Sequence, residues 1–84
     1  MDLAAIESRL MSGEELKIKY KYPRQLGPGE KGSAYGVRSD KLVDVSTELR
    51  RFYVIFRGQT PIWIEENEVI EITPDDGVYQ EFEE

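Results

Sequence analysis

Residues 50–73 read RRFYVIFRGQTPIWIEENEVIEIT and contain the clearest structural signal in the chain. Residues 50–56 begin with two arginines and continue with five apolar residues, so both faces of the strand are apolar. This pattern is typical of a central strand that is covered on both sides. Gly58 follows within a polar turn and can adopt positive φ, so the chain can return as a second strand at residues 61–64. After a short polar break, residues 69–72 predict a last strand. The segment therefore predicts a hairpin followed by a closing strand.

Residues 16–22 predict another strand, because apolar side chains alternate strictly with lysines along them. Before this strand, residues 1–13 predict a short helix that Asp2 can cap and that Gly13 ends. Leu3, Ile6 and Leu10 share one face of this helix. Because about three turns do not hold a helix alone in water, we expect this face to dock on the rest of the chain.

The middle of the chain is less regular. Residues 23–32 concentrate Gly and Pro, which predicts a long, mobile loop. Residues 33–38 predict a strand with Gly36 as a candidate bulge. Residues 39–41 predict a turn, and residues 42–46 fit either a short strand or an ordered loop.

The C-terminal residues 78–84 form an acidic tail that carries Tyr79 and Phe82. We expect this tail to fray unless another surface captures it. The chain is therefore divided into a helix at residues 1–13, a β domain at residues 14–74 and an acidic tail at residues 75–84.

Composition limits the function. The chain has 84 residues, room for one domain, and contains no cysteine and no histidine. Disulfides, thiol nucleophiles, imidazole-based triads and Cys or His zinc sites are thereby excluded. No run approaches the ~20 apolar residues of a membrane span and no signal-peptide pattern is present. We therefore expect a cytoplasmic protein that does not enter the membrane.

Charge is distributed unevenly along the chain, whose net charge is −6. Residues 14–57 carry ten basic and six acidic side chains, whereas residues 58–84 carry nine acidic side chains and no basic one. This asymmetry indicates either a basic face paired with the acidic tail or two different partner surfaces, beside the plainer interpretation of a solvated charged surface.

Residues 52–58 (FYVIFRG) followed by residues 62–72 (IWIEENEVIEI) resemble the last half of a Src-homology-three-like or Tudor-like barrel. In those folds a Tyr-x-Val-x-Phe strand, a tight turn, a Trp-bearing strand, one turn of 3₁₀-helix and a short closing strand recur. Residues 30–37 are similar to the second strand of such a barrel. The resemblance covers roughly residues 16–72. It implies a mainly β fold, a small five-stranded SH3-like barrel with a short N-terminal helix and an acidic C-terminal tail.

The resemblance does not carry every function of these families. The Ala-Leu-Tyr-Asp-Tyr run and the Trp pair of peptide-binding Src-homology-three domains are absent, so binding of proline-rich ligands is not implied. Tudor domains that bind methyl-lysine need an aromatic cage with an acid, since ring faces attract a cation. Tyr35, Tyr53, Trp63 and Glu65 are the candidates for such a cage. The alternative is that Tyr53 and Trp63 are core residues or cross-strand partners in the hairpin.

Lys17, Lys19 and Lys21, with Arg24 beside them, form a basic face on the strand at residues 16–22. Successive lysines on one strand face are about 7 Å apart, a ribbon suited to phosphates or to an acidic protein surface. A plain solvent face is the alternative. The net charge of −6 argues against nucleic acid, because phosphate contacts supply most of that affinity and call for a basic domain.

The leading hypothesis is a non-catalytic protein-interaction module or accessory subunit of a larger assembly. Its recognition elements are the loop at residues 23–32, the lysine face and the acidic aromatic tail. The alternative is a small barrel that binds nucleic acid through the lysine face, Arg50, Arg51 and nearby rings. The clustered carboxylates near residues 65–68 and 75–76 lack the spacing of a calcium loop, so we expect no bound metal. A hydrolytic carboxylate pair needs a cleft that a barrel of this size seldom provides, so we expect no enzyme activity and no cofactor.

Overall fold

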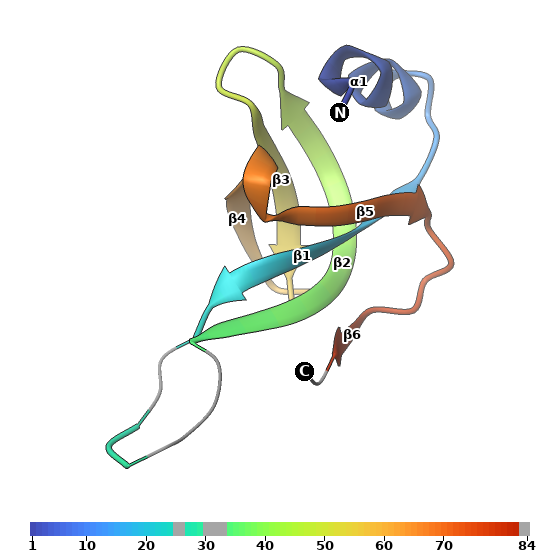
Figure 1. Cartoon of the computed structure of the whole chain (residues 1–84). Coiled ribbons are helices and arrows are strands. Elements are labelled where there is room, and N and C mark those ends of the chain that lie inside the picture. Colours follow the sequence, from blue (N-terminus) through green and yellow to red (C-terminus); the bar gives the residue numbers. More distant parts are fainter. Residues whose placement is uncertain (25–26, 30–33, 83–84) are drawn as a thin grey trace.

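The computed structural model describes residues 1–24, 27–29 and 34–82, and this part of the chain is mainly β with one short helix (Figure 1). All six strands belong to one antiparallel sheet. The mainly β class is thus confirmed. The elements are α1 (Leu3–Met11), β1 (Leu16–Pro23), β2 (Tyr35–Ser46), β3 (Arg51–Phe56), β4 (Thr60–Glu65), the 3₁₀ turn η1 (Glu66–Glu68), β5 (Val69–Pro74) and β6 (Gln80–Phe82).

The sheet has the strand order β4-β3-β2-β1-β5, and β6 pairs with β2 beside this path. The connection from β4 through η1 to β5 matches the turn and closing strand that the sequence predicts. Among the described residues no backbone pairing joins the edge strands β4 and β5, so the sheet is curved but open. Closure into the predicted five-stranded barrel is therefore not confirmed, and a sixth strand is present.

The core lies on the concave side of the sheet. The alternation predicted for β1 is confirmed, because Leu16, Ile18 and Tyr20 are fully buried while the lysines face the other way. Phe52 and Val54 of β3 meet them from the facing half of the sheet. At ~25 cal/mol per Å² of apolar surface removed from water, such residues supply most of the stability of a small domain.

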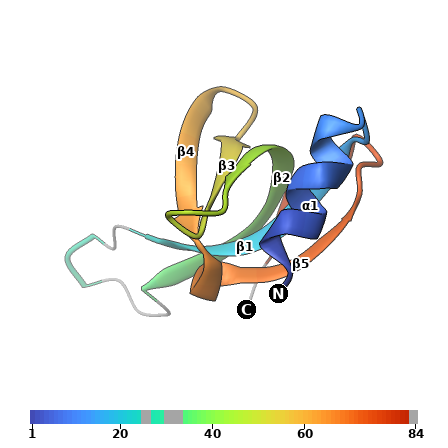
Figure 2. The ribbon, with the colours of Figure 1, turned by 90° about the horizontal axis from the view of Figure 1, so that it is seen from above.

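The helix α1 completes the core at one end of the sheet, beside β2 (Figure 2). Its Asp2 cap is confirmed, since the Asp2 Oδ1 accepts a hydrogen bond from the Ala5 backbone N–H at 3.1 Å. Leu3 and Ile6 are buried and Leu10 is partly buried in the same cluster. The predicted docking of the helix on its own chain is confirmed.

The strand β2 differs from the prediction made from its turn-forming residues. Instead of a turn at residues 39–41, one continuous strand runs through Tyr35–Ser46. Ser39 and Asp40 are buried inside it, and groups on other strands form hydrogen bonds with their side chains. The Tyr20 hydroxyl donates to Asp40, and the Ser39 hydroxyl accepts from a backbone N–H of β6. The predicted turn was therefore wrong.

Gly36 has a different role from the predicted bulge. It pairs with Tyr22 in a regular ladder, and the register shifts lie elsewhere, at Lys19/Tyr20 and between Leu42 and Asp44. A Cβ atom at position 36 would lie 2.5 Å from the Tyr22 ring. Glycine is therefore required here by close approach of the ring.

The described part of the acidic tail is captured instead of frayed. Residues 80–82 form β6 along the edge of β2 (Figure 1). The described residues do not include 25–26 and 30–32 of the predicted loop. They also leave out residue 33, where the next strand was predicted to begin, and residues 83–84 of the tail. Within the described part, no helix is long and apolar enough to cross a membrane.

Candidate interaction surfaces

The lysine face of β1 is largely engaged by the C-terminal segment. The Lys17 Nζ donates to the Asp76 carboxylate at 2.8 Å and to the Val78 carbonyl at 3.3 Å. The hydrogen bond from Lys17 lowers the pKa of Asp76. The Lys19 Nζ lies 4.2 Å from the centre of the Phe82 ring, a cation–π distance. Two of the three lysines of this face thus already have partners within the chain.

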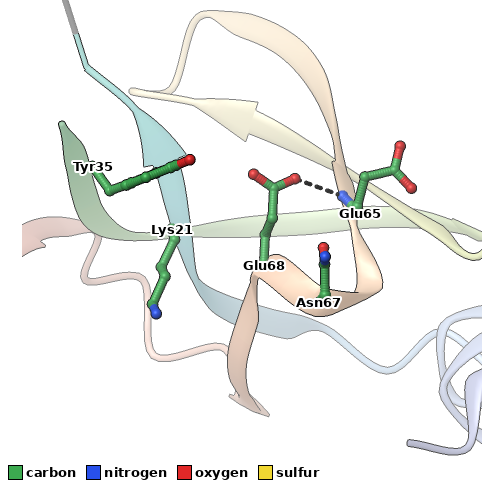
Figure 3. Close-up of a pocket in the computed structure, with 5 residues that line it drawn as sticks. All are labelled: Lys21, Tyr35, Glu65, Asn67 and Glu68. Carbon is green, nitrogen blue, oxygen red and sulfur yellow. Dashed lines mark hydrogen bonds between the residues drawn. The ribbon is translucent and has the colours of Figure 1, made fainter.

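Lys21 instead lines a pocket of about 430 Å³ between β1, β2 and η1 (Figure 3). Tyr35 and Glu65, both predicted site residues, line the same pocket with Asn67 and Glu68. The Glu68 carboxylate accepts from the Glu65 backbone N–H at 3.0 Å and closes the 3₁₀ turn by reciprocal capping. The pocket is therefore lined by one ring, one ammonium, one amide and two glutamates, of which Glu68 already caps the turn.

A separate aromatic surface lies on the outer side of the β3–β4 hairpin. We call it the hairpin face. The pairing register places Arg51 opposite Glu65 and Tyr53 opposite Trp63. The two rings meet edge to face with centroids 6.2 Å apart, a favourable aromatic geometry. The hairpin face consists of Arg51, Tyr53, Ile55, Pro61, Trp63 and Glu65.

The structure does not assemble the predicted cage of Tyr35, Tyr53, Trp63 and Glu65 as one group. It joins Tyr53 to Trp63 on the hairpin face and places Tyr35 in the pocket of Figure 3. The Trp63 ring already has a cation, since the Arg51 guanidinium lies 4.8 Å from its centre and pairs with Glu65 at 2.9 Å. The chain's own arginine therefore already covers the Trp63 ring.

The hairpin face also corrects the prediction that β3 is covered on both sides. Phe52 and Val54 are fully buried, whereas Tyr53 and Ile55 on the opposite face are only half-buried. Trp63 beside them is 57% exposed. Trp is highly buried on average in folded domains, so the exposure of Trp63 is unusual.

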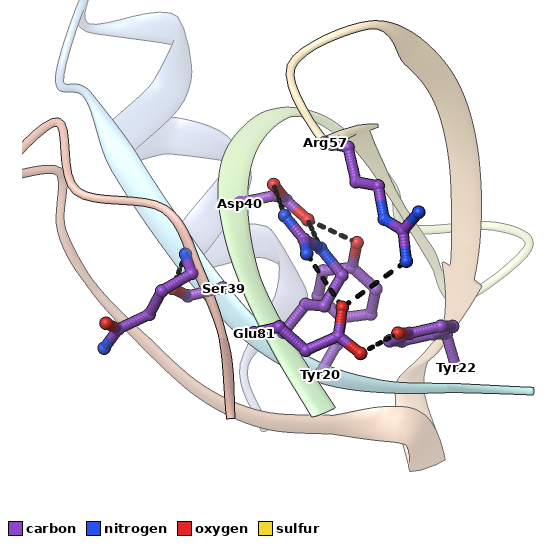
Figure 4. Close-up of polar contacts among 8 residues, drawn as sticks. Tyr20, Tyr22, Ser39, Asp40, Arg57 and Glu81 are labelled. Atoms are coloured by element: carbon purple, nitrogen blue, oxygen red, sulfur yellow. Dashed lines mark hydrogen bonds and ion pairs between the residues drawn. The ribbon is translucent and has the colours of Figure 1, made fainter. Parts of the chain in front are cut away.

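A polar network is buried on the concave side of β1 and β2 (Figure 4). Asp40 accepts from the Tyr20 hydroxyl at 2.6 Å and from the Arg38 Nε at 3.1 Å. Burial and the hydrogen bond to Asp40 raise the pKa of Tyr20 well above its usual range. Although burial lowers it, the hydrogen bonds to Asp40 and Glu81 raise the pKa of Arg38 overall. The network therefore keeps Tyr20 neutral and Arg38 charged.

Glu81 from β6 connects this network to the surface. Its carboxylate accepts from the Arg38 Nη1 at 2.9 Å and from the Tyr22 hydroxyl, and it pairs with Arg57 at 3.5 Å. Figure 4 shows Glu81 between Tyr22 and Arg57. The Tyr22 and Arg38 hydrogen bonds hold the pKa of Glu81 below its usual range, against the opposing effect of burial. Glu81 is thus ionised when β6 is docked.

A pocket of about 450 Å³ adjoins Glu81 and includes Arg24, the fourth predicted basic site residue. Its other lining residues come from the end of β1 and the β3–β4 turn. They are Tyr22, Pro23, Phe56 and Arg57. Arg24 therefore belongs with Arg57 and Glu81, and not with Lys17 and Lys19.

The sequence interpretation missed Arg38, Asp40, Arg57 and Glu81. The available signal was the spacing of Arg38 and Asp40, which places both on one face of a strand opposite Tyr20. Reading residues 39–41 as a turn concealed it. The contribution of Glu81 had no local signal, because its partners lie far away in the chain.

No group of three or more acidic side chains in the described ranges is arranged to hold a metal ion. Comparisons of the chain with protein-family models, curated proteins and solved structures find no match.

Proposed function

We propose that this chain is a non-catalytic protein-interaction module, an accessory subunit that docks a partner protein on the hairpin face. The observation that carries the proposal is the exposed Trp63 ring, which lies against Tyr53 and beneath Arg51. Trp, Tyr and Arg are the residues most enriched among binding hot spots. The ion pair between Arg51 and Glu65 fixes the Arg51 side chain, so less side-chain entropy is lost when a partner binds.

The charge pattern supports a polar rim around this aromatic centre. Arg51 and Glu65 lie at one end of the hairpin face, next to the strand β2 residues that pair with β3. Interfaces commonly surround a desolvated aromatic centre with such polar groups. A protein partner with an apolar pocket and a facing polar pair fits this arrangement.

Nucleic-acid binding through the lysine face is the alternative, and the side-chain contacts give it less support. Lys17 and Lys19 already contact Asp76, Val78 and the Phe82 ring. Two more of the predicted basic groups have acidic partners, since Arg50 pairs with Glu66 and Arg51 with Glu65. Phosphate binding would have to break these contacts in a chain of net charge −6.

Trp63 offers a direct test because it is the single tryptophan of the chain. Protein labelled with 5-fluorotryptophan gives one fluorine resonance, which reports on Trp63 even in an unlabelled extract of the native host. We expect this resonance to shift and broaden when the partner binds. A resonance that keeps the position and width of the isolated protein would contradict the proposal.

Affinity purification with matched variants identifies the partner and tests the site. Trp63→Ala should lose a co-purifying protein that Leu49→Ala retains, and the two replaced side chains are both 57% exposed. Truncation of a hot-spot Trp costs about 2 kcal/mol or more, or roughly 30-fold in Kd. Equal recovery with both variants would place the partner elsewhere on the molecule.

A further inference from the structure

The edge of β2 at residues 37–39 is covered by the chain's own C-terminal segment. β2 pairs with β1 along its first half and with β3 along its second half, so the other edge of the first half would be open without β6. β6 fills it with an antiparallel ladder that pairs Val37 with Phe82, Arg38 with Glu81 and Ser39 with Gln80. An open edge of this kind is a template for an added strand.

The side chains at this edge form a built receptor for a carboxylate. Arg38 is held by Asp40, so its guanidinium is fixed and still directs Nη1 toward Glu81. The two hydrogen bonds from Arg38 to Asp40 lie within β2, so they do not depend on β6. Arg57 approaches the same carboxylate from the β3–β4 turn, where it has a positive φ of 54°. This conformation belongs to the tight β3–β4 turn, in which Gly58 also has a positive φ.

The charges at this edge favour an acidic occupant. Arg38 and Asp40 balance one another, and Arg57 adds a positive charge that Glu81 neutralises. Removal of β6 would leave a positive surplus beside the tyrosine hydroxyl that now donates to Glu81.

The present occupant is small in comparison with the receptor. β6 has three residues, and the Glu81 side chain is 36% exposed. The described part of β6 adds a ladder of only three residue pairs, so this strand is held marginally. Beside it, the pocket of about 450 Å³ lined by Arg24, Arg57 and Phe56 is not filled by β6. The receptor therefore has room for a longer acidic segment.

The connection before β6 favours displacement over exchange between two copies. Residues 75–79 form a compact turn in which Asp75 accepts from the Gly77 N–H at 2.9 Å and from the Tyr79 hydroxyl at 2.7 Å. Lys17 fixes the same turn through Asp76. A strand swap would have to open these contacts, whereas a peptide in trans has only to replace residues 80–82.

We propose that the β2 edge at residues 37–39, with Arg38 and Arg57, binds an extended acidic peptide of a partner protein, and that residues 80–82 occupy the edge when this peptide is absent. The recognised segment carries a glutamate followed by an aromatic residue. The glutamate meets Arg38, Tyr22 and Arg57, and the aromatic ring lies over Lys19. This site is separate from the hairpin face and does not depend on its function.

A fluorescent peptide with the sequence of residues 78–82 is the probe, blocked at both ends, and the same peptide with glutamine in place of glutamate is its control. A tethered tail competes at an effective concentration on the order of millimolar, so the wild-type chain should bind the probe weakly. Glu81→Gln in the full chain weakens this competitor. We expect the Glu81→Gln chain to bind the probe about tenfold or more tightly than wild type, because β6 leaves the β2 edge in a larger fraction of the molecules. Glu48→Gln, an equal charge change at an exposed turn, should match wild type.

Three results would overturn the proposal. One is equal binding of the probe by Glu81→Gln and Glu48→Gln, and another is equal binding of the glutamate and glutamine peptides. The third is a dimer of Glu81→Gln by light scattering, which would show that a second copy takes the edge. Trp63→Ala should bind the probe normally, so failure here and failure on the hairpin face are distinguishable.

Hydrogen exchange on the wild-type chain tests the proposal without a variant. The amides of residues 80–82 should exchange much faster than those in the β1–β2 ladder, because β6 must detach while the core stays folded. Equal protection of both sets would make β6 a permanent strand and would refute the proposal.

Discussion

Tyr20→Phe removes one hydroxyl from the buried polar network and leaves the ring in place. Tyr20 is fully buried, and its hydroxyl donates to the Asp40 carboxylate at 2.6 Å. After the change, Asp40 keeps only its hydrogen bonds from Arg38 in this network. The variant therefore isolates a single hydrogen bond to a buried charge.

The expected loss is about 2 kcal/mol in the free energy of unfolding, since a hydrogen bond to a charged group contributes roughly 1.5–3 kcal/mol. A domain of 84 residues has about 4–13 kcal/mol in total at the usual value per residue. At roughly 4–8 °C per kcal/mol for a domain of this size, Tm should fall by about 8–16 °C. One oxygen atom thus accounts for a large share of the stability.

Urea unfolding followed by far-ultraviolet circular dichroism measures this loss. Fluorescence is a poor probe here, because Trp63 is already exposed in the folded state. Tyr22→Phe is the matched control, since its hydroxyl contacts the partly exposed Glu81 and should contribute less than 1 kcal/mol. Equal losses for the two variants, or a Tyr20→Phe loss under 0.5 kcal/mol, would refute the reasoning.

Tyr20→Phe should also change how the free energy of unfolding depends on alkaline pH. The folded state raises the pKa of Tyr20, so above about pH 10 the unfolded chain releases the proton while the folded chain retains it. Stability is full below the unfolded pKa and falls as pH rises above it. Tyr79, whose pKa is raised to about 12 by burial and Asp75, adds a smaller effect of the same sign. Tyr20→Phe should show a shallower alkaline decline than wild type.

Leu3→Ala should lower the free energy of unfolding by about 2–4 kcal/mol, because Leu3 is buried in the core cluster. Met11→Ala on the exposed side of α1 should change it by less than about 0.5 kcal/mol. Thermal melts of the two variants compare them directly. If the two melts coincide, α1 is not docked as described. Gly36→Ala places a Cβ atom 2.5 Å from the Tyr22 ring and should cost about 1–3 kcal/mol. It should also loosen the contact of Tyr22 with Glu81, seen as faster amide exchange in β6, and an unchanged exchange rate would show that the ring can move aside freely.

Local patterns predicted most of the sheet. The lysine alternation fixed the inward face of β1, and the apolar run with Gly58 fixed the β3–β4 hairpin. These signals work because they depend on neighbours along one strand or across one turn. The helix cap at Asp2 belongs to the same class, since its partner is three residues away.

The missed features depend on residues far apart in the chain. Ser39 and Asp40 have turn chemistry, and only their partners on β1 and β6 make a strand acceptable there. Glu81 reaches Arg38 from 43 residues away, so no local pattern marks the tail as a strand. The aromatic residues of the predicted cage failed to meet for a related reason, because Tyr35 lies on a different part of the curved sheet from Trp63.

The pairing of β1 with β5 has a consequence for synthesis on the ribosome. β1 is made before β2, β3, β4 and β5, and β5 is the strand that covers its second edge. During translation that edge is exposed to other nascent chains while β2, β3 and β4 are still being added. The three lysines spaced along β1 then act as gatekeepers, since like charges keep two such unfinished edges apart.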